Sequence, residues 1–98
     1  MLNRKSMKSK EFYVKLQKTL EETTSFPAEY LFKFIVPTQG NGVKEVADQF
    51  DNLGAVIKTN TSKKGTYTSV SIQVMMQSAS QVITKYQEVS KIEGIISL

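Results

Sequence analysis

The stretch "SKKGTYTSVSIQV", residues 62–74, decides the fold. Its polar start suits a tight turn, because Gly65 can adopt a positive φ at little cost. From Ser69 to Met76, small polar and apolar residues alternate, which is typical of a strand with one dry and one wetter face. The preceding "AVIKTNT", residues 55–61, looks like a second strand. Together they predict a β-hairpin.

A strand is also predicted upstream of the hairpin. Residues 29–36, "EYLFKFIV", are rich in aromatic and branched side chains. Lysine is almost never buried without a partner. We therefore predict that the side of this strand that carries Leu31, Lys33 and Ile35 lies at the surface. The opposite side belongs to the core.

Two helices flank the hairpin in the sequence. Helical spacing of apolar residues predicts one helix over 43–50, with Gly54 as its C-terminal cap. It predicts another up to about residue 91, which begins with a capping box formed by Ser78 and Gln81.

The predicted order is β-α-β-β-α-β, with "EGIISL" (93–98) as the last strand. Two crossover helices joined by a hairpin give an α+β sandwich of the ferredoxin-like type, an antiparallel four-stranded sheet with both helices on one face. The other face is then solvated, covered by a further helix, or used to bind something.

An amphipathic helix over residues 10–22 precedes this unit and carries Phe12, Tyr13, Leu16 and Leu20 on its apolar side. It could lie over the bare face of the sheet and give a monomer, or leave that face free for a dimer. We divide the chain into a basic tail with this helix, residues 1–25, and a ferredoxin-like domain, residues 26–98.

The composition narrows the chemistry. Cysteine and histidine are both absent, which removes the thiolate nucleophile, the commonest metal ligand and the commonest general base. The sequence therefore predicts no enzyme, no cofactor and no metal site. The net charge of +4 comes from four basic residues among the first ten, and the rest of the chain is balanced. We interpret them as a solvated tail.

The compartment is predicted to be cytoplasmic. The most apolar run, residues 30–36, is far too short to span a bilayer. The basic start of the chain lacks the apolar region of a secretory signal.

A loop with two glycines is one candidate site. Gly40, Asn41, Gly42 and Val43 lie between the first strand and the following helix, where exposed N–H groups can receive an anion or a small effector. A flexible turn with Asn41 as N-cap explains the same residues.

The sheet is the other candidate, as a surface for a protein partner or a second copy. A nucleic-acid-binding module is the alternative, through the lysines of the hairpin and the basic tail. That match is weak, because Thr66 and Thr68 stand where such a module carries stacking rings. The candidate surface comprises Leu31, Lys33, Ile35, Lys58, Lys63, Lys64, Ser69, Ser71 and Met75.

The hairpin stretch, the Phe26-Pro27 pair and the ending "QEVSKIEGIISL" resemble the YbeD-like family of small bacterial proteins. The resemblance runs from about Phe26 to Leu98. It implies a fold similar to the ACT regulatory domains, in which a loop like that at Gly40 and Gly42 approaches a small effector. The Asp-x-Pro-Gly approach of those domains is missing here. The family has no established activity, so the resemblance implies no catalytic residues.

These patterns lead to one functional hypothesis, a regulatory or adaptor domain that binds a protein chain or, weakly, a small effector. They do not identify the partner, the ligand, the pathway or the oligomeric state. They also leave open whether the N-terminal helix covers the sheet.

Overall fold

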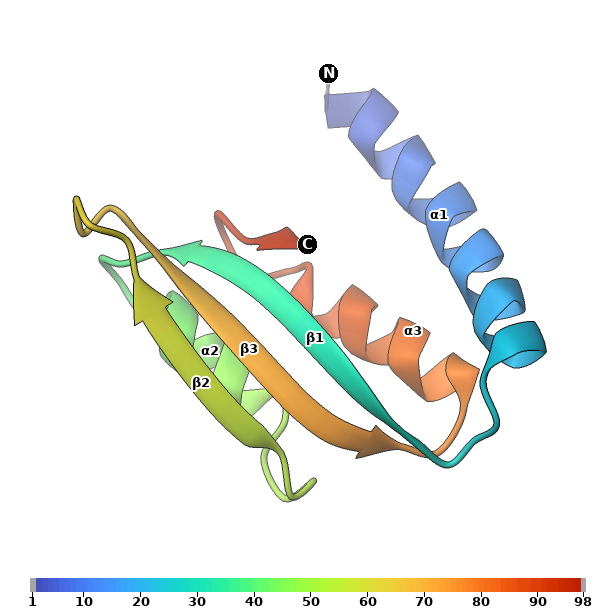
Figure 1. Ribbon diagram of the computed structural model, residues 1–98. Helices are drawn as coiled ribbons and strands as arrows, with labels where there is room; N and C mark the ends of the chain where they lie inside the picture. Colours follow the sequence, from blue (N-terminus) through green and yellow to red (C-terminus); the bar gives the residue numbers. More distant parts are fainter. Residues whose placement is uncertain (1, 98) are drawn as a thin grey trace.

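A computed structural model describes residues 2–97, with side chains from Lys10 onward. The chain order is helix, strand, helix, two strands, helix, strand (Figure 1). The elements are α1 (Leu2–Thr23), β1 (Ala28–Pro37), α2 (Gly42–Asp48), β2 (Val56–Thr61), β3 (Tyr67–Met76), α3 (Ala79–Val89) and β4 (Ile96–Ser97).

The four strands form one antiparallel sheet in the order β2-β3-β1-β4. Helices α2 and α3 lie behind the sheet in Figure 1, and no helix crosses the face turned to the viewer. This is the ferredoxin-like sandwich that the sequence predicts, with α1 added before β1.

The hairpin between β2 and β3 is confirmed. The amide of Ser62 donates to the carbonyl of Tyr67 at 2.8 Å, and the amide of Gly65 donates to the carbonyl of Ser62 at 2.9 Å. Gly65 has a φ of +75°, which only glycine adopts without strain. The turn therefore fixes the register in which Thr61 faces Thr68.

The core lies between the sheet and the helices. Phe32 is fully buried at its centre, and its ring lies 5.0 Å from both the Phe50 and the Tyr86 rings. As predicted, alternate residues of β1 and β3 point into it. The hydroxyl of Thr68 is buried and is satisfied by hydrogen bonds to Thr38 and Thr61.

The sequence left open whether the N-terminal helix covers the bare face of the sheet, and the structure places the helix elsewhere. Helix α1 packs against α3 and lies beyond the β1 edge of the sheet (Figure 1). The Tyr13 ring stacks on the Tyr86 ring at 6.3 Å, and Leu20 joins the core. The ring of Tyr86 on α3, which also contacts Tyr30 and Phe32 of β1, explains this choice, because it gives α1 an apolar partner that the polar centre of the bare face does not offer.

Several predicted boundaries also move. Helix α1 begins at Leu2, earlier than residue 10, and α2 ends at Asp48, so Gly54 is not its cap. At the start of α3, Ser78 Oγ accepts from the amide of Gln81 at 3.1 Å, as predicted. The Gln81 side chain reaches past Ser78 and accepts from the amide of Gln77, which makes the capping box one residue wider.

Candidate functional site

The side of the sheet opposite α2 and α3, here called the open face, is built by strand alternation. Residues directly paired across strands share a face, so the β1–β3, β2–β3 and β1–β4 registers assign every position. The open face comprises Glu29, Leu31, Lys33, Ile35 and Pro37 from β1, Val56, Lys58 and Asn60 from β2, Tyr67, Ser69, Ser71, Gln73 and Met75 from β3, and Ile96 from β4.

Large apolar side chains on this face meet water. Leu31 is 60% exposed and Val56 is 54% exposed, and they flank Gln73 in one cross-strand row. Met75 is exposed one step beyond that row, and Ile96 lies at the other end beside Ile35. A cluster of this kind costs free energy in water, and on monomeric proteins it marks interaction sites.

The middle of the open face is basic. Lys33 pairs with Ser71, which pairs with Lys58, so two ammonium groups flank one hydroxyl. The ion pairs among the described residues are formed by Lys44 and Lys85, and neither of them includes Lys33 or Lys58. The carboxylate of Glu29 accepts a hydrogen bond from Gln73 at 2.8 Å, near the Met75 end. Within the described side chains, the positive charge at the centre therefore has no ion-pair partner.

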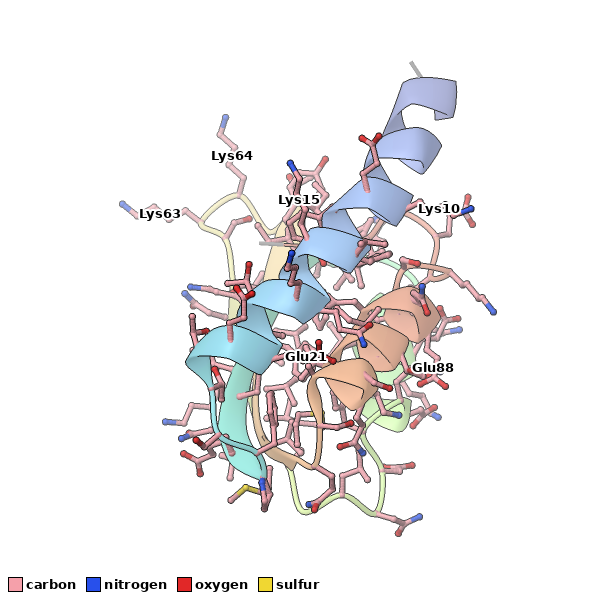
Figure 2. All side chains as sticks on the ribbon, turned by 90° about the vertical axis from the view of Figure 1, so that its right-hand side faces the viewer. Lys10, Lys15, Glu21, Lys63, Lys64 and Glu88 are labelled. Carbon is pink, nitrogen blue, oxygen red and sulfur yellow. The ribbon has the colours of Figure 1, made fainter. Side chains whose placement is uncertain are left out.

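The predicted interaction surface is only partly brought together. Leu31, Lys33, Ile35, Lys58, Ser69, Ser71 and Met75 all lie on the open face. Lys63 and Lys64 instead extend from the tip of the hairpin into solvent (Figure 2). Lys58 lies about 10 Å along β2 before the strand ends at Thr61, and Lys63 and Lys64 lie in the turn beyond that end, so the three lysines do not share one site.

Residues missed by the sequence reasoning complete the face. Tyr67 and Gln73 follow from the same alternation that identifies Ser69 and Ser71, so the sequence carried that signal. Val56 and Asn60 needed the hairpin register, and Ile96 needed the pairing of β4 with β1.

The glycine loop is placed between β1 and α2, where Asn41 is the N-cap but its side chain makes no capping hydrogen bond. A Cβ on Gly42 would lie 2.9 Å from Cβ of Val36. Close approach of α2 to β1 therefore accounts for this glycine. Gly40 has a φ of +91°, which accounts for the other.

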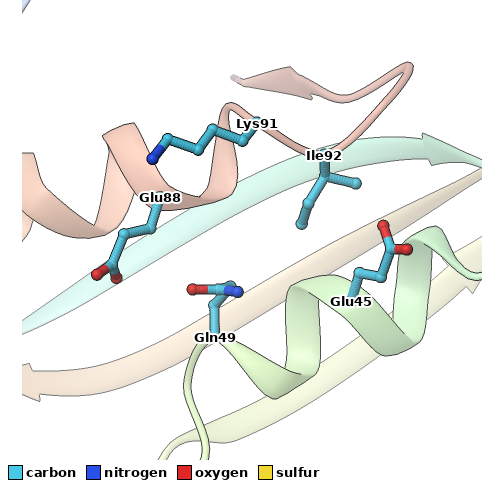
Figure 3. A pocket seen from close by; sticks show the side chains of 5 residues that line it. All are labelled: Glu45, Gln49, Glu88, Lys91 and Ile92. Carbon is cyan, nitrogen blue, oxygen red and sulfur yellow. The ribbon is translucent and has the colours of Figure 1, made fainter.

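A shallow pocket of about 330 Å³ lies between α2 and the end of α3, lined by Glu45, Gln49, Glu88, Lys91 and Ile92. Figure 3 shows the two carboxylates at opposite ends of it. Oε1 of Glu88 is buried and accepts no hydrogen bond, although Lys85 Nζ lies 3.1 Å away as an ion-pair partner. No group of three metal-ligating side chains occurs among residues 2–97.

Lys85 has a structural role beside this pocket. Its ammonium donates to the carbonyl of Gln49 at 2.6 Å and lies 5.6 Å from the centre of the Phe50 ring. It ties α3 to the turn after α2. Within the described part of the chain, no helix is both long and apolar enough to cross a membrane.

A family model described as "Protein of unknown function (DUF493)" matches residues 21–98. A UPF0250 protein of Haemophilus influenzae (strain PittEE) is 34% identical over 78% of this chain and 86% of its own length. A UPF0250 protein of Shewanella sediminis is also 34% identical, over 82% of this chain and 94% of its own length.

The solution structure of protein HP0495 from H. pylori has the same fold. It aligns with a TM-score of 0.63 at 19% identity and covers 78% of this chain and 86% of the other.

Proposed function

The chain belongs to the DUF493 family of proteins of unknown function, which confirms its resemblance to the YbeD-like proteins. On that premise, we propose that it is a non-enzymatic adaptor domain that docks another protein chain on its open face. The composition supports a binding role, because the sequence offers neither histidine nor cysteine for proton transfer or nucleophilic attack.

One observation carries the proposal. The large apolar side chains Leu31, Val56, Tyr67, Met75 and Ile96 are each about half exposed or more and lie on the same face of the sheet. The core is built on the opposite face of the sheet, so these side chains lie outside it. Large apolar side chains gathered on one exposed face are a mark of interaction sites.

The glycine loop supports small-effector binding less well. Gly42 is explained by its contact with Val36, and the neighbouring helix α2 is short. A protein partner on the open face is therefore the better-supported reading.

Nucleic-acid binding is the second candidate, and Lys33 and Lys58 are the observation that favours it. Its weakness is aromatic content, because stacking on bases requires rings and Tyr67, at the end of β3, is the one ring on the open face as described. A titration with generic single-stranded RNA at low salt tests it, and absence of binding there would remove it.

The adaptor proposal is tested by affinity capture from native extract with three baits. The wild-type chain and Val14→Asp, whose site on α1 is 66% exposed, should retain the same protein partner. Leu31→Asp should lose it, because a carboxylate on the open face cannot be buried against an apolar partner.

Circular dichroism of the three baits checks that each is folded. Retention of every partner by folded Leu31→Asp would refute docking on the open face.

A further inference from the structure

The open face has a pattern that specifies the shape of its partner. Along β1 it reads apolar, basic, apolar at Leu31, Lys33 and Ile35. Successive positions on one face of a strand are about 6.7 Å apart. Four residues of an α-helix rise about 6 Å.

Because these two spacings are similar, we infer that the docked chain is an amphipathic helix, an inference that rests on the proposed function. The helix carries an acidic residue, with one apolar residue four positions before it and another four positions after it. The helix lies along β3. Its apolar residues contact the Leu31 and Ile35 ends of the face, and its carboxylate meets the basic row between them.

The middle strand leaves room for such a helix. In the Lys33 and Ile35 rows of the open face, β3 presents the short side chains of Ser71 and Ser69, while β1 and β2 present longer ones on both sides. The longer Gln73 of β3 lies in the Leu31 row, at one end of this space. The two flanking strands are about 9.6 Å apart, close to the diameter of a helix with its side chains. A helix above Ser71 is therefore flanked by Lys33 and Lys58.

Charge complementarity selects the acidic residue. A carboxylate above Ser71 can receive one hydroxyl and two ammonium donors, and bonds from charged donors are among the strongest available. Neither lysine has a carboxylate within ion-pair distance in the described structure. A partner with lysine at this position would add a third positive charge to the row.

The test uses designed peptides of about 20 residues, long enough to be helical alone. One carries Leu, Glu and Leu at four-residue spacing, and its control carries Lys in place of Glu. Titration of the labelled full chain, followed by amide NMR shifts, should show the Glu peptide perturbing the open-face residues of β1 and β3. The Lys peptide should bind at least about tenfold more weakly.

A charge swap separates recognition from folding. The double variant Lys33→Glu with Lys58→Glu should prefer the Lys peptide over the Glu peptide, a reversal that a misfolded protein cannot produce. The control variant Lys63→Glu with Lys64→Glu, at the hairpin tip, should keep the wild-type preference. Added salt should weaken the preferred complex in each case.

Three results would overturn the inference. If neither peptide perturbs the face while Leu31→Asp still loses its captured partner, the adaptor proposal stands and the acidic helix is wrong. If single-stranded RNA perturbs the same amides and displaces the Glu peptide, the face belongs to nucleic acid. If the chain sediments as a dimer and Leu31→Asp makes it a monomer, a second copy occupies the face.

Discussion

At Gly42, the absence of a side chain lets the start of α2 approach β1. An added Cβ would be 2.9 Å from Cβ of Val36 and 3.3 Å from both of its methyl groups, distances at which atoms must move. Val36 is fully buried, so it has little space to yield. The residue is thus explained by packing.

Gly42→Ala should lower the free energy of unfolding by about 1–3 kcal/mol, the usual cost of crowding a packed core. Denaturant unfolding measures it. Lys44→Ala, which removes only an exposed ion pair with Asp48, is the control and should stay within about 0.5 kcal/mol of wild type. Equal effects in both variants would show that Val36 relaxes freely.

At the scale of elements, α1 is held by one stripe of its surface. Tyr13, Leu16 and Leu20 face α3 and the core, while Phe12 and Val14 remain exposed. Sequence spacing identified Leu16 and Leu20 as the apolar side but could not say which surface they would cover. That surface is created by α3 and β1 only after the sheet has formed.

Leu20→Ala should lower the free energy of unfolding by about 2–3 kcal/mol, because it removes a buried side chain and leaves a cavity at the base of α1. Val14→Ala on the same helix changes an exposed residue and should change the free energy of unfolding by less than about 0.5 kcal/mol. Thermal or denaturant unfolding gives both values. A loss for Leu20→Ala as small as that for Val14→Ala would mean that α1 is not docked in solution.

At the scale of the whole molecule, Tyr86 joins three elements. Its hydroxyl is 3.0 Å from that of Tyr30 on β1, and its ring stacks on Tyr13 of α1. Burial, and then the hydrogen bond with Tyr30, raise the pKa of Tyr86 above its ordinary value of 10.0. The folded chain therefore holds this proton at pH values where the unfolded chain has lost it.

This difference makes global stability fall at high pH. The contribution of Tyr86 to the free energy of unfolding is complete below about pH 10, where its hydroxyl is protonated in both the folded and the unfolded chain. It is lost as the pH rises above that value, because the hydroxyl then ionises only in the unfolded chain. In Tyr86→Phe, the decline of unfolding free energy between about pH 10 and 11 should be shallower by up to about 1.4 kcal/mol per pH unit. Tyr67→Phe, on the open face, is the control, and an unchanged slope in Tyr86→Phe would contradict the linkage.

The parts of the fold that depend on local sequence could be predicted. The glycine turn and the strict alternation after Ser69 defined the hairpin, and the lysine at position 33 oriented β1. The register between strands that are distant in the sequence could not be predicted. Nothing in the local sequence around Lys33 or Lys58 indicates that they lie on either side of Ser71. The residues of the basic row were thus predicted, but their alignment in one row was not, and the apolar residues Val56 and Ile96 were missed.

The interleaving of the two faces along β1 and β3 has an evolutionary consequence. Because neighbouring residues point in opposite directions, a substitution can alter the outer surface without touching the interior, but inserting or deleting one residue exchanges the two sets over the rest of the strand. Recognition can therefore drift by point mutation at little cost to folding. Changes in chain length should be tolerated best in the turn at 62–65 and in the other connections between elements.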